Sequence, residues 1–201
     1  MHISEGILAA PVLISGAALT GAGLGVALKK LNNEDIPKVG VLSAGFFVAG
    51  LIQVPIGITS VHLVLNGLVG LVLGWLCFPA IFVGLLLQSI MFQYGGTTAL
   101  GVNTFNMAFP ALVSGFFFGR LAIRTSKTYL SSVFAFLAGS LAVFLSGILV
   151  GISLYLTGDA FLPAAKIVVA AHIPVMVIEG IITAACVTFL KKVKPELLSM
   201  T

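Results

Sequence analysis

The sequence predicts an all-α integral membrane protein, and two observations indicate this class: the composition and the length of the apolar runs. Of the 201 residues, 59% are hydrophobic and only 8% are charged, whereas charged residues make up about 25% of a soluble domain. The mean hydropathy is +1.20. The apolar runs are long enough to cross a bilayer as helices, and the alternating pattern of a membrane β-barrel is absent. We therefore expect one transmembrane domain over residues 1–201, in the cell (cytoplasmic) membrane.

Seven apolar helices are expected, each bounded by polar, basic, Gly or Pro residues. The first ends at Lys29-Lys30, and the second begins after Pro37, a residue that suits the first turn of a helix. Residues 95–103 are interpreted as a Gly/Thr loop between the fourth and fifth helices. The expected helical ranges are about 7 or 11 to 28, 39–54, 60–78, 79–92, 106–123, 129–156 and 164–190.

The basic residues predict how these helices are oriented. With seven spans, alternate loops share a side of the membrane, and nine of the ten Lys and Arg residues then fall on one side. Only Lys166 falls on the other side. Because basic loops remain in the cytoplasm, we expect a cytoplasmic C-terminus and an external N-terminus. The net charge of +4 is accounted for by these short loops, so it does not imply nucleic-acid binding.

The dipeptide Met1-His2 carries the groups of a metal chelator. The α-amine of Met1, the main-chain amide nitrogen of His2 and the His2 imidazole can close two fused rings in one plane around a divalent metal. Such a site suits Ni²⁺ or Cu²⁺, and also Co²⁺, better than Zn²⁺, Mg²⁺ or Ca²⁺. A His at position 2 is often incidental. The predicted orientation nevertheless places this one outside, and no secretory signal peptide is evident.

His62 is the candidate for a fourth nitrogen donor. We expect it one turn into the helix 60–78, at the outer end, on the same side of the membrane as His2. Asn66 would then share its helical face, because residues four apart are neighbours on a helix. A histidine that only hydrogen-bonds between helices is the alternative interpretation.

Other polar residues are expected to orient these ligands. The loop 95–103 combines glycines, which allow close approach of the backbone, with hydrogen-bonding Thr and Asn side chains, although an ordinary external loop would look similar. Glu179 is the only acid deep within an expected span, where a charge is costly and marks function. It could orient a ligand, relay a proton or stabilise helix packing, and His172 on the same helix could be an orienting or a purely structural residue. The expected orienting residues are Asn66, Thr97, Thr98, Asn103, Asn106, His172 and Glu179.

The absence of two sequence motifs argues against an enzyme. The sequence contains no nucleotide-binding loop and no HExxH zinc motif, so we do not expect an enzyme, and any ATP hydrolysis would belong to a partner. A variant that keeps the metal but assigns vitamin or cofactor uptake stays open, and so do two other classes of function. One is a proton-coupled secondary transporter of a small solute that uses Glu179, and the other is an intramembrane hydrolase that uses Ser60 with His62 or His172.

Four segments carry a family resemblance: 1–6 (MHISEG), 60–63 (SVHL), 95–107 (GGTTALGVNTFNM) and 172–180 (HIPVMVIEG). Together they resemble the cobalt- and nickel-uptake membrane proteins of the energy-coupling-factor type, CbiM and NikM. The resemblance covers essentially the whole chain. One departure is Val61-His62, where the family usually has Gly-His, and this changes the freedom of the backbone before the histidine.

The resemblance implies that Co²⁺ or Ni²⁺ is the transported substrate. It implies metal ligation by the α-amine of Met1, the amide and imidazole nitrogens of His2, and the imidazole of His62. It also implies three partners: a transmembrane coupling protein of the Q type, ATPase subunits of the O type, and a small membrane protein of the N type that is not fused to this chain. The choice between cobalt and nickel stays open.

Overall fold

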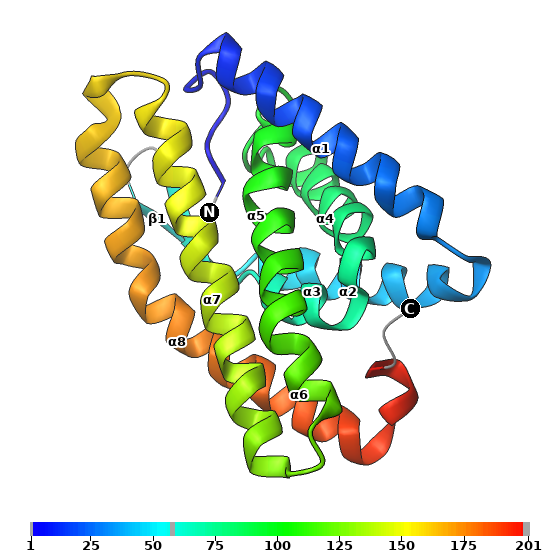
Figure 1. The fold of residues 1–201 in the computed structure, drawn as a ribbon. Helices are drawn as coiled ribbons and strands as arrows, with labels where there is room; N and C mark the ends of the chain where they lie inside the picture. Colours follow the sequence, from blue (N-terminus) through cyan, green and yellow to red (C-terminus); the bar gives the residue numbers. More distant parts are fainter. Residues whose placement is uncertain (1, 57–58, 199–201) are drawn as a thin grey trace.

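The computed structural model describes residues 2–56 and 59–198, and these residues are almost entirely helical (Figure 1). Within them, five helical stretches are long and apolar enough to cross a membrane: Ala10–Lys30, Asn66–Phe92, Leu100–Arg124, Thr128–Tyr155 and Asp159–Val193. The helices are α1 (Ala10–Lys30), α2 (Ile36–Ala49), α3 (Asn66–Leu73), α4 (Cys77–Phe92), α5 (Leu100–Ser114), α6 (Arg120–Arg124), α7 (Thr128–Tyr155) and α8 (Leu162–Val193). A π-helical turn, Gly115–Gly119, joins α5 to α6. The multi-pass helical architecture is as expected, but the count of seven spans is not confirmed.

The difference in count arises between residues 50 and 78. The expected helix 39–54 ends at Ala49 and is followed by a hairpin of β1 (Gln53–Ile56) and β2 (Thr59–His62), which pairs Gln53 with His62. The run Thr-Ser-Val-His includes two β-branched residues and fits a strand. Pro55 is tolerated because both strands of a two-stranded sheet are edge strands.

The position expected for His62 within a helix is therefore wrong. His62 ends β2, and Asn66 begins α3, so the two residues do not share a helical face. The chain between them passes through Leu65, which has a left-handed φ of 55°. A non-glycine residue rarely adopts this conformation, so surrounding contacts must hold the connection in place.

The third and fourth expected helices meet without a loop. A 3-10 helix, Gly74–Leu76, joins α3 to α4, and Gly74 supplies the break with a φ of 54°. Pro79 lies in the first turn of α4 and does not separate two helices, because a helix tolerates Pro where its N–H would have no partner. The stretch Asn66–Phe92 is the most buried of the five candidate spans.

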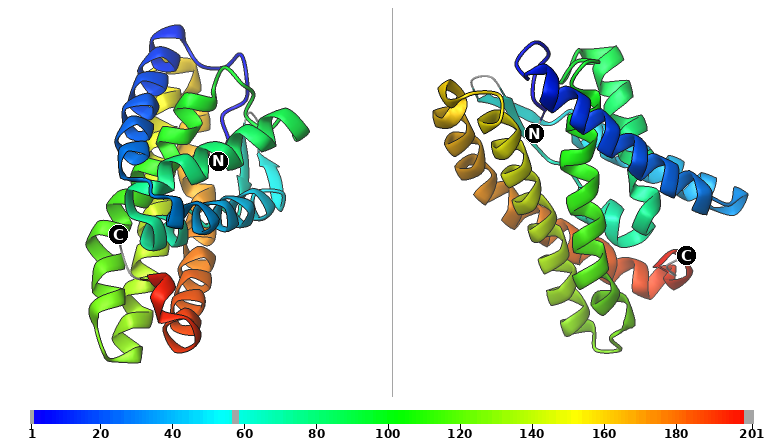
Figure 2. Two further views of the ribbon diagram at one scale, coloured as in Figure 1. Left: turned by 90° about the vertical axis from the view of Figure 1, so that its right-hand side faces the viewer. Right: turned by 45° about the horizontal axis from the view of Figure 1, so that its top comes forward.

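Helices α7 and α8 lie side by side along most of their length (Figures 1 and 2). Small residues allow this approach: a Cβ at Gly139 would lie 2.8 Å from the carbonyl oxygen of Glu179 and 2.6 Å from Thr183 Oγ1. Close backbone contact through glycine is typical of helix pairs in membranes. As a result, the main chain of Glu179 packs directly against Gly139 of α7, and the Glu179 side chain is fully buried.

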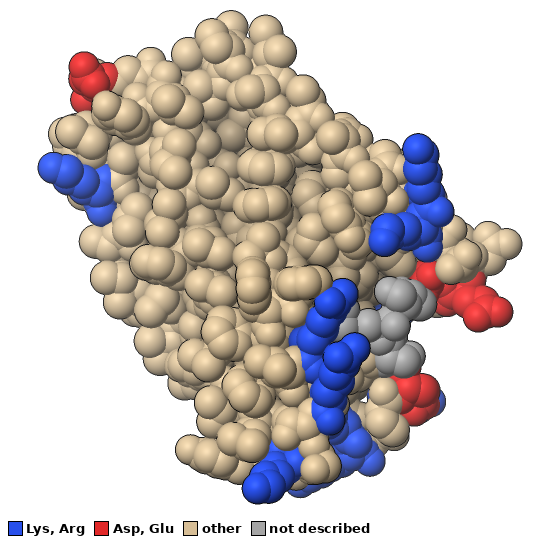
Figure 3. All heavy atoms as spheres, viewed as in Figure 1, with Lys and Arg blue, Asp and Glu red and all other residues tan. Residues whose placement is uncertain are grey.

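Most of the basic side chains visible in Figure 3 gather along the lower and right-hand edge of the molecule, whereas the upper left carries one basic and one acidic patch. At this basic end Lys191 of α8 donates hydrogen bonds from Nζ to the carbonyl oxygens of Ala122 (2.8 Å) and Thr125 (2.7 Å). These carbonyls lie at the end of α6, where helical partners are missing. The N-terminal segment, by contrast, descends from the top of the molecule between α5 and α7 (Figure 1).

Candidate metal site

His2 and Ile3 of the N-terminal segment are buried, and Asn103 of α5 holds the main chain of Ile3. His2 is 3% exposed and Ile3 is fully buried. The Asn103 side chain accepts a hydrogen bond from the Ile3 N–H at Oδ1 (3.0 Å) and donates from Nδ2 to the Ile3 carbonyl oxygen (3.1 Å). This pair of bonds has the pattern of strand pairing, and it fixes the depth at which His2 enters the protein.

The loop before α5 covers this segment. Gly95 and Gly96 have φ values of +79° and +75°, a conformation that glycine adopts at little cost. A Cβ at Gly95 would lie 3.3 Å from His2 Cβ, and a Cβ at Gly96 would lie 2.5 Å from Glu5 Cβ. The glycines therefore allow the loop to lie directly on the N-terminal segment.

Two imidazoles meet beneath this loop. The ring centroids of His2 and His62 are 4.5 Å apart, and the ring planes differ by 18°. His62 is 3% exposed, and it reaches the pair from the end of β2, not from a helix. The hairpin and the N-terminal segment thus bring together two residues that are 60 positions apart in the sequence.

Gln88 of α4 sets the tautomer of His2. Its Nε2 donates to the Phe47 carbonyl oxygen (2.9 Å), and its Oε1 faces His2 Nε2 at 2.8 Å. Because an amide oxygen only accepts, His2 Nε2 carries the proton, and the lone pair of the neutral ring lies on Nδ1. Gln88 is not among the residues expected from the sequence. The available signal was an amide within the otherwise apolar run Leu-Leu-Leu-Gln of a membrane helix.

His62 and His172 adopt the opposite tautomer. Each donates from Nδ1 to a main-chain carbonyl oxygen: His62 to that of Leu63 (2.7 Å) and His172 to that of Val168 (2.6 Å). In each ring the lone pair is on Nε2, and neither Nε2 has a hydrogen-bond partner among the described residues. A buried nitrogen acceptor without a partner is costly unless another ligand occupies it.

Burial keeps the two facing imidazoles neutral. Desolvation is the largest cause that lowers the pKa of His2 to about 3. The same cause, with the neighbouring His2 as a smaller one, lowers the pKa of His62 well below its usual range. Neutral imidazole is the form that binds metal ions, so both rings are ready for ligation at physiological pH.

Glu179 acts on the backbone that follows His62. Its fully buried carboxylate accepts hydrogen bonds from the main-chain N–H groups of Val64 and Leu65, the latter at 2.9 Å. These bonds hold the left-handed turn at Leu65 and so fix the end of β2 where His62 lies. The carboxylate is thus engaged with the main chain beside the imidazole pair.

The remaining expected orienting residues divide into two groups. Asn66 donates to the Met107 carbonyl oxygen (3.1 Å) and Ser146 Oγ (2.9 Å), and Asn106 donates to Ser153 Oγ (3.1 Å), so both connect helices. Thr97 and Thr98 are exposed on the covering loop. The structure therefore brings four of the expected residues to the site: His2, His62, Asn103 and Glu179. The other four form no described hydrogen bond with either imidazole: Asn66, Asn106, Thr97 and Thr98. Met1 lies outside the described residues.

Side chains alone do not complete a metal site here. Across residues 2–56 and 59–198, no group of three or more His, Cys, Asp or Glu side chains converges as metal ligands. The pair of imidazoles provides two nitrogen donors. Further donors would have to come from the main chain or from the region of the N-terminus.

Comparison with known proteins agrees with this architecture. The family profile of CbiM, described as the cobalt uptake substrate-specific transmembrane region, matches residues 2–197. A putative metal transport protein of Haemophilus influenzae is 41% identical over 100% of this chain and 98% of its own length. A putative fused nickel transport protein NikMN of Archaeoglobus fulgidus is 30% identical over 98% of this chain and 68% of its own length.

The fold is also similar to that of a solved structure. A crystal structure described as a truncated transition metal transporter superposes with a TM-score of 0.76 at 26% identity, covering 96% of this chain and 99% of that one. Together with the five apolar helices, these likenesses identify a multi-pass protein of the cell membrane. The chain belongs to the CbiM family of substrate-specific transmembrane proteins.

Proposed function

We propose that this protein is the substrate-binding membrane component of a transporter that takes up Co²⁺ or Ni²⁺. The observation that carries the proposal is the buried pair of neutral imidazoles, His2 and His62, with ring centroids 4.5 Å apart beneath the Gly95-Gly96 loop. Relatives in the same family are named for cobalt transport and for nickel transport, and both ions accept nitrogen ligands.

The proposed ligands are the α-amine of Met1, the amide nitrogen and Nδ1 of His2, and Nε2 of His62. In such a chelate the amine and amide nitrogens close a five-membered ring, and the amide nitrogen and Nδ1 close a six-membered ring. Only Nδ1 of His2 can reach a metal held by its own amide nitrogen. The tautomer imposed by Gln88 places the lone pair on that atom, and the tautomer of His62 leaves Nε2 for the fourth position.

The proposed direction of transport follows from the charges. The basic end of the molecule (Figure 3) would face the cytoplasm, since basic loops stay inside, and the N-terminal segment would then open to the outside. Energy would come from partners: ATPase subunits of the O type acting through a coupling protein of the Q type, with a small N-type membrane protein. No nucleotide-binding motif is present in this sequence.

The direct test is the metal content and X-ray absorption spectrum of protein purified with its native, untagged N-terminus. We expect about one Ni²⁺ or Co²⁺ per chain, bound by nitrogen or oxygen donors with no sulfur scatterer, because the proposed ligands are all nitrogen. Variants that lack His2 or His62 should purify without metal. A sulfur shell, or full metal content in both variants, would rule out the proposed site.

Glu179 is proposed as a positioning residue for His62. In Glu179→Gln the amide oxygen can take the place of Oε1, which accepts from Val64 and Leu65, but the NH₂ group replaces Oε2 and sets a donor against the Leu65 N–H, so the turn at Leu65 should loosen. We expect metal affinity to fall by about 10- to 100-fold, as for other changes behind a ligand. Metal titration would be compared with Glu196→Gln, a change at an exposed carboxylate.

The Glu179→Gln variant also distinguishes the proposed metal transporter from a proton-coupled secondary transporter. A proton-coupled secondary transporter that uses Glu179 would move its solute without any ATPase subunit and would bind metal equally well after Glu179→Gln. That result would overturn the positioning role. A shift in the visible spectrum of bound Co²⁺ in Glu179→Gln would support the positioning role of Glu179. A variant that is only less stable would bind less metal, but the ligand field of the metal that it still binds would be unchanged.

Gln88→Leu is expected to weaken metal binding by about 10- to 100-fold, because it removes the acceptor that fixes the tautomer of His2. Isothermal titration of purified protein with Ni²⁺ would measure the change. Ser89→Ala is the matched control, since Ser89 is the next residue of α4 and is also buried. Equal affinities for the Gln88→Leu variant and the parent would show that Gln88 is only a packing residue.

A further inference from the structure

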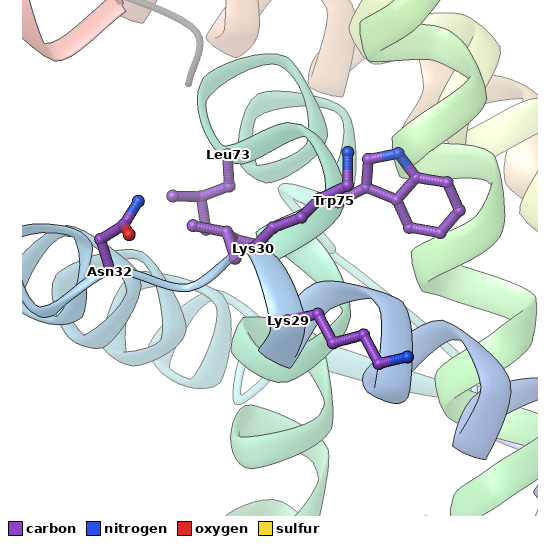
Figure 4. Close-up of a pocket in the computed structure, with 6 residues that line it drawn as sticks. Lys29, Lys30, Asn32, Leu73 and Trp75 are labelled. Carbon is purple, nitrogen blue, oxygen red and sulfur yellow. The ribbon is translucent and has the colours of Figure 1, made fainter.

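A cationic pocket lies at the basic end of α1. It has a volume of about 370 Å³ and is lined by Lys29 and Lys30 from the last turn of α1, by Asn32, and by Leu73, Trp75 and Leu76 from the α3–α4 junction (Figure 4). The ammonium of Lys30 is 5.8 Å from the centroid of the Trp75 ring. No acidic side chain lines the pocket, and neither lysine is in an ion pair within the described part of the chain.

An apolar groove continues from this pocket. It has a volume of about 180 Å³ and lies between α1, α4 and α5, where Leu19, Val26, Phe78 and Phe109 contribute to its walls. Trp75 lines both the groove and the cationic pocket. From Lys30 back to Leu19 is 11 residues of helix, or about 16 Å at ~1.5 Å per residue, so the groove extends from the membrane boundary toward its centre.

The order of side chains along this surface, cationic first, then aromatic and then apolar, matches the parts of one phospholipid. Two ammonium groups and an amide would bind an anionic headgroup, an indole stands at the boundary where Trp is enriched in membrane proteins, and an aromatic-lined groove would take an acyl chain. We propose that the pocket of Lys29, Lys30 and Trp75, together with the adjoining groove, binds one anionic phospholipid. The site is separate from His2 and His62 and does not depend on the metal that the protein carries.

Native mass spectrometry of the full chain tests the proposal. Protein would be equilibrated with phosphatidylglycerol or with phosphatidylcholine of the same acyl chains, and the retained lipid counted. We expect retention of one phosphatidylglycerol, with a preference over phosphatidylcholine of about 10- to 30-fold, because each lysine near a lipid surface favours anionic lipid by about a factor of five. Equal retention of the two lipids would overturn the proposal.

Two pairs of variants separate the headgroup from the acyl chain. Lys29→Gln with Lys30→Gln should abolish the preference, whereas Arg124→Gln with Lys127→Gln, two exposed changes at the same basic end, should keep it. Ala22→Trp should fill the groove and reduce retention of both lipids. Ala18→Trp, on an exposed part of α1 outside the groove, is its control.

The remaining outcomes are equally decisive. Loss of partner-subunit binding in Ala22→Trp with unchanged lipid retention would show that the groove is a protein interface, and it would overturn the proposal. Competition by soluble glycerol phosphate at the same concentration as the lipid would show that the pocket binds phosphate without an acyl chain. This result would also overturn the proposal. Metal binding by each variant, which we expect to be unchanged, reports that the protein is folded.

Discussion

Addition of a single residue before Met1 is expected to abolish high-affinity binding of Ni²⁺ or Co²⁺ while the protein stays folded. The added residue turns the α-amine of Met1 into an amide, which binds a metal only after it loses its proton, and it moves the amine one residue away from His2, which is buried. Loss of a direct ligand should cost at least as much as loss of a residue behind one, that is, on the order of 100-fold or more in affinity.

The structure makes this test specific. His2 is 3% exposed and the main chain of Ile3 is bonded on both sides by Asn103, so the segment cannot slide outward to place a new terminus at the same point without breaking those bonds. Isothermal titration of the extended protein would be compared with a protein extended by one residue at the C-terminus. Undiminished affinity after the N-terminal extension would refute the chelate, although His2 and His62 could still bind metal as a pair.

Replacement of His62 is expected to have the next largest effect. His62→Ala removes the fourth nitrogen donor, and affinity should again fall on the order of 100-fold. Because the imidazole is buried and stacked on His2, the Ala variant also leaves a cavity. His62→Gln fills more of that space with a neutral side chain, and we expect it to fold normally and still to bind metal weakly.

His172 provides the comparison for this experiment. It is equally buried, it donates from Nδ1 to a main-chain oxygen as His62 does, and its Nε2 also lacks a hydrogen-bond partner among the described residues. The proposed ligand set predicts a much smaller loss for His172→Ala than for His62→Ala. If the two losses were reversed, the fourth donor would be His172, and His62 would be a stacking partner of His2.

The long helices could be predicted closely from the sequence. The expected ranges 129–156 and 164–190 differ by only a few residues from α7 (Thr128–Tyr155) and α8 (Leu162–Val193). Their apolar runs are long, and basic residues or Pro mark their ends. The prediction failed at residues 50–65, because hydropathy alone does not distinguish a buried hairpin from a helix, and a short apolar stretch with β-branched residues suits either.

The candidate site was predictable in its parts but not in its geometry. The structure brings His2, His62 and the Gly95-Gly96 loop together, and their location on the outer side of the membrane stays a prediction. The role of Gln88 depends on which nitrogen of a ring faces which atom of an amide 86 residues away, and no local pattern encodes this. The same is true of Glu179, whose partners are main-chain N–H groups 114 and 115 residues away.

The contact between Ile3 and Asn103 has a consequence for biosynthesis. Ile3 leaves the ribosome well before Asn103, the residue that binds it, which lies 100 positions later, and α7 is made later still. The two hydrogen bonds between Ile3 and Asn103 therefore form only after α5 has been synthesised, and the burial of Ile3 against Asn103 cannot precede that step.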